Sequence, residues 1–220
     1  MKRILCVLLV WMNGFLCLNA AHGQGKFSMS ITGTPFYRYA RTERSTYFPG
    51  LNGGSAIPVD IHVRQSGVGD SLGAMVRYSL STQWSVSSGV WFNHIAYKQP
   101  TISTSPSQTV LFTDTRSRNF QVPLLANCEL SSKRISPYFS GGVVLSLPSN
   151  VIWPDGSTFK NADKRVRLYP TLGAGVLYHL SADASLIAQP SLTYILPIGN
   201  YTTYKNYQFG FQAKLMYIFH

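Results

Sequence analysis

The sequence YKNYQFGFQAKLMYIF, residues 204–219, decides the fold of this chain. From Tyr207 to Phe219 every second residue is apolar or aromatic, and the residues between them are mostly polar or small. Because alternate side chains of a strand point to opposite faces, this stretch predicts a strand with one apolar and one polar face. Aromatic residues at the ends of the apolar face are typical of a transmembrane β-barrel strand, with lipid outside and a polar lumen inside.

The start of the chain predicts an exported protein. A charged beginning is followed by an apolar stretch over residues 4–18 and by small residues at Ala21 and Gly23. This order predicts a secretory signal peptide cleaved after Gly23, since about fifteen apolar residues are short for a membrane span. The expected organisation is a signal peptide, residues 1–23, and one outer-membrane β-barrel domain, residues 24–220.

The composition favours a membrane barrel over a soluble domain. Hydrophobic residues make up 45% of the chain and charged residues 12%, which is about half the charged fraction usual in soluble domains. The net charge of +11 raises the alternative of a nucleic-acid-binding protein. The cations are scattered over predicted loops and form no compact block, so we expect no nucleic-acid partner and instead anionic lipid head groups or polysaccharide.

Eight stretches show the alternation expected of strands. They cover about residues 27–39, 71–80, 83–97, 116–130, 135–147, 167–180, 184–196 and 204–219. Short connections (81–82, 131–134 and 181–183) alternate with mostly longer ones (40–70, 98–115, 148–166 and 197–203). This sorting predicts an eight-stranded antiparallel up-and-down transmembrane β-barrel with short periplasmic turns, longer extracellular loops and both termini in the periplasm.

Prolines and glycines interrupt several of these strands. Proline cannot donate to a strand ladder, so a proline in mid-strand predicts a bulge or a different register. Five prolines fall inside the predicted strands: Pro35, Pro123, Pro137, Pro170 and Pro190. Gly141-Gly142 and Gly173-Ala174-Gly175 are expected where a small barrel curves sharply.

Several segments resemble the porin-like outer-membrane β-barrel domain family of the Bacteroidetes. They are residues 120–125 (FQVPLL), 136–143 (SPYFSGGV), 173–176 (GAGV) and 189–194 (QPSLTY), together with the terminal strand around Gly210. The resemblance covers about residues 24–220 and implies a small outer-membrane barrel. Gln121 departs from the family, whose members often have a carboxylate at this position.

The same resemblance implies delivery by periplasmic chaperones and recognition of the last strand by the barrel assembly machinery. That machinery reads a polar residue, a glycine and then alternating hydrophobic residues. Gln208, Gly210, Tyr217 and Phe219 are the residues expected to form this assembly signal.

An eight-stranded barrel has a lumen filled by side chains. Arg77, Glu129 and Lys214 are expected to point inward in the periplasmic half of their strands. We expect Glu129 to pair with Arg77 or Lys214, because an unpaired buried carboxylate is costly. The cluster is interpreted as a structural plug, with a gate in a narrow channel as the alternative.

Basic residues in the predicted loops suggest contact with lipopolysaccharide phosphates, which arginine and lysine bind well. The candidates are Arg41, Arg44, Arg64, Lys160, Lys164, Arg165 and Arg167. The alternative is a solvated surface without a ligand.

No catalytic or metal-binding pattern is present in the sequence. His62, Asp60 and Asp70 are predicted to share one loop, but the chain has no nucleophile elbow, closely spaced carboxylates or metal-ligand cluster. His94 is expected at the membrane interface and His179 in the lumen or at its rim. We therefore expect no enzymatic activity, cofactor or metal.

The sequence favours an integral outer-membrane barrel with a structural, surface-interaction or ligand-binding role. A narrow ion or solute channel is the first alternative. A secreted soluble β-barrel that binds a small apolar ligand is the second, and it would place the apolar faces of the strands in a protein core.

Overall fold

The computed structural model describes residues 27–48, 57–104, 108–111, 114–147, 150–152, 158–160, 165–197, 199 and 201–219. The expected signal peptide lies outside these residues. All regular structure in the described part is β-strand, and no helix there has the length and apolarity needed to cross a membrane.

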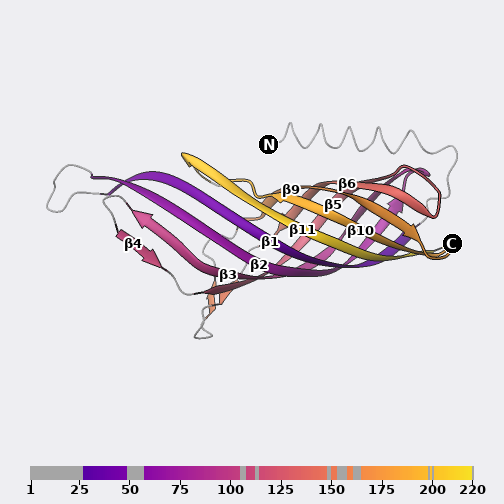
Figure 1. Ribbon diagram of the computed structural model, residues 1–220, viewed down its shortest axis with the longest axis horizontal. Helices are drawn as coiled ribbons and strands as arrows, with labels where there is room; N and C mark the ends of the chain where they lie inside the picture. Colours follow the sequence, from indigo (N-terminus) through magenta and orange to yellow (C-terminus); the bar gives the residue numbers. More distant parts are fainter. Residues whose placement is uncertain are drawn as a thin grey trace.

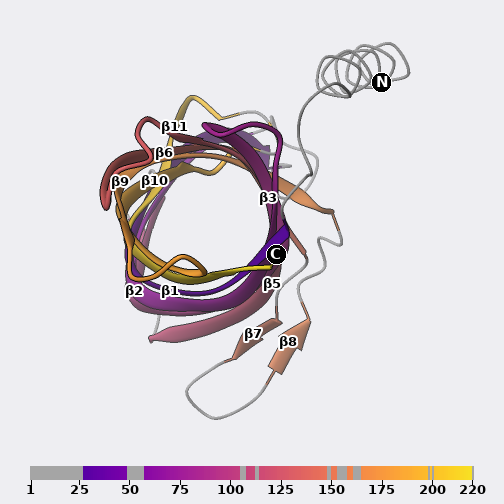
Figure 2. The ribbon, with the colours of Figure 1, turned by 90° about the vertical axis from the view of Figure 1, so that its right-hand side faces the viewer.

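Eight long strands form a closed antiparallel ring (Figure 2). They are β1 (Phe27–Phe48), β2 (Ile57–Ser79), β3 (Trp84–Thr104), β5 (Thr115–Glu129), β6 (Ile135–Ser146), β9 (Arg167–His179), β10 (Ala184–Tyr194) and β11 (Thr203–Ile218). Each pairs with the next around the ring, and β11 closes it on β1. The predicted eight-stranded up-and-down antiparallel barrel is confirmed.

Three short strands lie within the predicted loops. They are β4 (Gln108–Leu111), which pairs with β3, and β7 (Asn150–Ile152) and β8 (Thr158–Lys160), which form a hairpin beside β5. In Figure 2 β7 and β8 project from the side of the ring. They add local structure at one end of the barrel without changing the ring.

The two ends of the barrel differ, and we call them the turn end and the loop end. At the turn end, residues 80–83, 130–134 and 180–183 connect consecutive strands. Two of these turns are built alike. The Ser81 hydroxyl accepts a hydrogen bond from the Trp84 backbone N–H at 3.0 Å, and Ser181 accepts one from Ala184 at 3.1 Å. A serine that satisfies the backbone locally stabilises such a tight turn.

At the loop end, β1, β2, β3 and β4 continue as a sheet beyond the tip of β11 (Figure 1). Residues 40–70 and 98–115 were predicted as loops, and this prediction is wrong for most of their described residues, which belong to strands. The reason is physical. In β1, polar residues occupy both faces over residues 40–48, so this part lacks the apolar alternation from which a membrane strand is recognised. In β2, Ile57, Val59, Ile61 and Val63 do alternate with Pro58, Asp60 and His62, and this signal in the sequence was missed.

The apolar sides of the ring strands face outward. On β11 the outward residues Phe209, Phe211 and Leu215 are 55%, 51% and 55% exposed, whereas Gln212 and Lys214 point into the lumen and are 4% and 3% exposed. This distribution is the reverse of a soluble fold, in which polar atoms face the water. It contradicts the soluble alternative, which required these apolar residues in a sealed core.

The prolines within the strands do not shift the register. Around Pro123, Ser88 pairs with Leu124 and Trp91 pairs with Gln121, so the ladder loses contacts locally and resumes in phase. The prediction of a bulge or a changed register at these prolines is therefore wrong. The register shift between β2 and β3 lies elsewhere, between Arg64 and Ser66 of β2. Flanking ladder hydrogen bonds hold the phase where a proline removes one.

Glycines allow close approach of neighbouring strands in the ring. A Cβ on Gly142 would clash with the carbonyl oxygen of Leu124, and one on Gly175 would clash with that of Ala188. Both glycines lie in the segments predicted to accommodate curvature.

Candidate functional site

The lumen is closed at the turn end by a cluster around Glu129, which we call the plug. His179 Nε2 lies 3.0 Å from Glu129 Oε1, and an Arg77 Nη atom lies 3.6 Å from Oε2. The other ring nitrogen of His179 lies 3.0 Å from the hydroxyl of Ser185. Four strands, β2, β5, β9 and β10, are thus connected through one buried carboxylate.

Lys214 lies near the plug but does not form the ion pair with Glu129 that was expected as the alternative to Arg77. It makes no ion pair among the described residues, and its ammonium lies 5.8 Å from the ring centre of Tyr138. The Arg77 guanidinium lies at the same distance from that ring. Tyr138 in turn donates a hydrogen bond to Asn127 Oδ1 at 2.8 Å. Of the two partners expected for Glu129, the structure brings Arg77 to it and places Lys214 over an aromatic face.

The closer partner of Glu129, His179, was not predicted as one. The sequence placed His179 in the lumen or at the rim, and nothing in one strand alone shows which residue of another strand it meets. Two signals were available. The alternation along β9 places His179 on the inward side, and His179 is the last residue of β9, at the turn end. Glu129 is likewise on the inward side and is the last residue of β5, at the same end of the barrel.

Above the plug, amide side chains fill the middle of the lumen. Gln189 donates to Gln212 Oε1 at 2.5 Å and to the Ser140 hydroxyl at 3.0 Å. The cavity at this level has a volume of about 30 Å³, which holds one or two water molecules. The middle of the lumen is therefore a constriction closed by hydrogen-bonded side chains.

The lumen widens at the loop end into a cavity of about 410 Å³, which we call the vestibule. Its described lining includes three arginines and four tyrosines, namely Arg38, Arg165, Arg167, Tyr97, Tyr169, Tyr201 and Tyr204. Arg38 Nε donates to Asn206 Oδ1 at 3.2 Å, and its guanidinium lies 5.8 Å from the ring centre of Tyr97.

The seven basic residues predicted to meet lipopolysaccharide do not form one cluster. Arg165 and Arg167 line the vestibule, while Arg41 and Arg64 are cross-strand neighbours that point outward. Arg44 is exposed further along β1, Lys160 lies in β8, and Lys164 lies outside the described residues.

Arg41 and Arg64 belong to a row of cations that the sequence did not show. Lys205 of β11 pairs with Arg41 of β1, which pairs with Arg64 of β2, and all three are exposed on the outer wall. We call these three residues the cation row. Arg41 also forms an ion pair with Glu43 at 2.6 Å. The hydrogen bond from Thr203 and then that from Arg41 lower the pKa of Glu43 to about 2.

A row of tyrosines lies two residues closer to the middle of the barrel. Tyr194, Tyr207 and Tyr39 are cross-strand neighbours on β10, β11 and β1, and the last two rings are 5.4 Å apart. Ten residue steps on β11 separate Tyr207 from Tyr217. At ~3.4 Å per residue and a tilt of about 40°, they span about 26 Å, the height of the apolar band of a transmembrane barrel.

The predicted assembly residues divide between the two faces of β11. Gln208 and Gly210 point inward, and Gly210 packs against the inward side chains of Thr34 and Phe36. Tyr217 and Phe219 are exposed outside, with ring centres 5.2 Å apart.

The other two histidines within the described residues pair with carboxylates on the strand surface. His62 lies 3.6 Å from Glu43, and His94 lies 3.5 Å from Asp70. The prediction that His62, Asp60 and Asp70 share a loop is wrong, because all three lie on β2. No group of three or more His, Cys, Asp or Glu within the described ranges is arranged to hold a metal ion.

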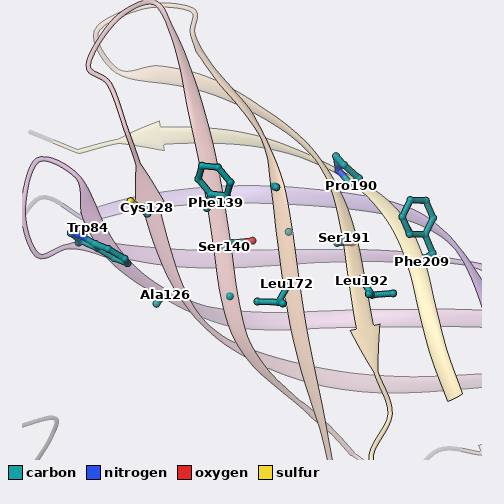
Figure 3. A pocket seen from close by; sticks show the side chains of 13 residues that line it. Trp84, Ala126, Cys128, Phe139, Ser140, Leu172, Pro190, Ser191, Leu192 and Phe209 are labelled. Carbon is teal, nitrogen blue, oxygen red and sulfur yellow. The ribbon is translucent and has the colours of Figure 1, made fainter. Parts of the chain in front are cut away.

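The outer wall has an apolar depression over β5, β6, β9 and β10 (Figure 3). Small residues, including Ala126 and Gly141, form its floor, and Phe139, Leu172 and Leu192 stand around it. Cys128 is among the residues that line it, on the apolar side of β5. The depression is part of the apolar outer wall.

A closed ring of eight antiparallel strands with an apolar outer wall and a polar, filled lumen defines the class of small transmembrane β-barrels. No protein-family model matches the chain, and no curated protein matches it significantly. Solved structures do match. The Neisserial surface protein A (NspA) is 14% identical, with a TM-score of 0.52, over 87% of this chain and 97% of that chain.

Two Pseudomonas aeruginosa barrels give lower scores. The outer membrane protein OprG is 14% identical, with a TM-score of 0.47, over 90% of this chain and 98% of its own. The N-terminal β-barrel domain of OprF is 14% identical, with a TM-score of 0.46, over 88% of this chain and all of that domain. At this identity the likeness to NspA shows the shared fold alone.

Proposed function

We propose that this chain is an integral outer-membrane barrel with a sealed lumen that acts at the cell surface through its loop end, without catalysis of its own. The observation that supports the sealed lumen is the pair of closures inside the barrel. The plug around Glu129 closes the turn end, and the hydrogen-bonded amides Gln189 and Gln212 close the middle. A vestibule and a strand-built extension above a closed lumen fit ligand binding or surface interaction.

The orientation follows from the same proposal. The turn end and both termini of the barrel domain face the periplasm, and the extension faces the exterior, as in barrels with short periplasmic turns. The signal peptide, the chaperones and the barrel assembly machinery belong to this proposal, with Gln208, Gly210, Tyr217 and Phe219 as the recognised strand. Membership of the porin-like Bacteroidetes family also stays a prediction.

The sealed lumen has a direct test. Purified protein of residues 24–220, shown to be closed by heat-modifiable migration in a gel, is expected to give no single-channel currents in planar bilayers. A large-pore porin in the same bilayers is the positive control. Reproducible currents would favour the channel alternative, and a change in those currents in Glu129→Gln would identify the plug as its gate. Protein that stays soluble without detergent would refute the membrane proposal itself.

We also propose that the cation row binds lipopolysaccharide phosphates. Lys205, Arg41 and Arg64 lie just beyond the tyrosine row, where the head groups of the outer leaflet begin. Arginine and lysine donate charge-assisted hydrogen bonds to phosphate.

The double variant Arg64→Gln/Lys205→Gln tests this contact and keeps the Arg41–Glu43 ion pair. At about 1 kcal/mol for each cation near an anionic membrane surface, affinity for lipopolysaccharide in mixed micelles is expected to fall about 30-fold. The control, Lys133→Gln/Arg134→Gln, removes two exposed cations at the turn end. Equal losses in both variants would show attraction by net charge without a site.

A further inference from the structure

The vestibule has the size and position of a binding site for a small ligand. Its volume of about 410 Å³ falls in the range of ligand pockets. It opens at the loop end and ends at the closed middle of the lumen. A ligand that enters would therefore be held there, since the constriction beneath it holds only water-sized molecules.

Arg38 gives the vestibule a positioned anion-binding group. The hydrogen bond from its Nε to Asn206 and the ring of Tyr97 fix the plane of the guanidinium. Asn206 is itself held, because its amide donates to the Tyr204 hydroxyl at 3.2 Å. The Nη hydrogens of Arg38 make no hydrogen bond within the described residues. A fixed guanidinium with unused donors matches the two oxygens of a carboxylate or sulfate.

The lining around Arg38 is aromatic and rich in hydroxyl and amide groups. Tyr201 and Tyr204 have ring centres 5.1 Å apart and form one aromatic wall. Asn119, whose amide donates to the Ser146 hydroxyl at 2.6 Å, stands among the polar lining. The described lining contains no carboxylate. Flat amphipathic rings combined with many donors and acceptors suit a sugar ring, which has apolar C–H faces and a hydroxyl edge.

We propose that the vestibule binds an acidic saccharide of one or two rings, with the anionic group on Arg38 and a sugar ring against the tyrosines. A free inorganic anion would use the arginines but not the aromatic wall. A membrane lipid phosphate is disfavoured, because the vestibule lies inside the ring of strands and the cation row lies outside it. The inference rests on the proposed function, since the loop end must face the exterior to meet such a ligand.

Calorimetric titration of the processed barrel in detergent micelles tests this proposal. The probe is cellobiouronic acid, a disaccharide with one carboxylate, and its matched neutral probe is cellobiose. We expect saturable binding of the acid, binding of cellobiose at least about tenfold weaker, and no displacement of the acid by an equimolar amount of sulfate. Absence of saturable binding, equal binding of cellobiose, or displacement by equimolar sulfate would each overturn the proposal.

Variants locate the binding on the structure. Arg38→Gln is expected to weaken binding of the acid about tenfold, and Arg38→Lys is expected to recover part of the loss. Tyr97→Leu removes a ring beside Arg38 and provides a second variant if Arg38→Gln fails to form a heat-modifiable barrel. The control, Arg116→Gln, removes an exposed outward cation on β5 and should leave binding unchanged. An equal loss in Arg116→Gln would overturn the assignment to the vestibule.

The two proposals fail in different ways. A closed, non-conducting, membrane-embedded barrel that binds no acidic disaccharide refutes the vestibule site alone. A conducting or water-soluble protein refutes the proposed function, whatever the titration shows.

Discussion

Replacing Glu129 by glutamine is expected to lower the free energy of unfolding by about 3 kcal/mol. The substitution removes the negative charge from the plug but leaves the buried Arg77 and Lys214 there without the carboxylate that balances them. Loss of one partner of a buried ion pair is strongly destabilising because the other charge stays buried and uncompensated. The Nε atom of Arg77 is already buried without a hydrogen-bond partner, so the charge of Arg77 depends all the more on Glu129 for compensation.

Guanidinium unfolding in detergent micelles, followed by tryptophan fluorescence, measures this loss. Glu43→Gln is the matched control, because Glu43 also pairs with an arginine but lies at the loop end, on the outer wall. It should leave the unfolding midpoint unchanged. The double variant Arg77→Met/Glu129→Gln removes both charges of the pair and should recover part of the lost stability. If Glu129→Gln unfolds at the same midpoint as the parent protein, the plug contributes nothing to stability.

The ring strands were predictable because the membrane constrains both of their faces. Each outward side chain must be apolar and each inward one must suit a polar lumen, so the alternation in residues 207–219 appears directly in the sequence. The three short connections likewise contain the serines and small polar residues of tight turns, as Ser81 and Ser181 show.

The end of β1 could not be predicted in the same way. Residues 44–48 continue the strand beyond its last pair with β11, which joins Glu43 to Thr203, and residues 40–48 have no apolar face. Pairing with β2 stabilises this segment, and that pairing is a long-range property of two strands. A pattern search within one strand therefore assigns such residues to a loop.

The sequence did not predict the cation row, the His179–Glu129 contact or the vestibule, because each depends on which strands are neighbours. The cation row needs Lys205, Arg41 and Arg64 at one level on three strands that include both ends of the described chain. The contact of His179 with Glu129 and the vestibule have the same origin. Parity places a residue inside or outside the ring, but only the register places two residues at the same height.

Replacing Ala213 by arginine is expected to lower the free energy of unfolding from a bilayer by about 2–4 kcal/mol. Ala213 is exposed on the outer wall of β11 and lies near the middle of the interval between Tyr207 and Tyr217. An arginine at the midplane of a transmembrane barrel costs this much, because its charge must be moved out of water into hydrocarbon. On a soluble protein the same exposed substitution would change stability by only about 0.5 kcal/mol.

A second alanine-to-arginine substitution separates the effect of depth in the membrane from the effect of changing the side chain. Ala184 also lies on the outer side of the ring, but it is the first residue of β10 and pairs with Tyr217 at the turn end. Ala184→Arg should therefore cost no more than about 1 kcal/mol, as expected near the interface. Both variants are unfolded with guanidinium from phosphatidylcholine vesicles and compared with the parent. Each variant replaces one outward alanine by arginine, so a larger loss of unfolding free energy for Ala213→Arg indicates hydrocarbon around the middle of the barrel. Equal small losses in the two variants would mean that the wall faces water.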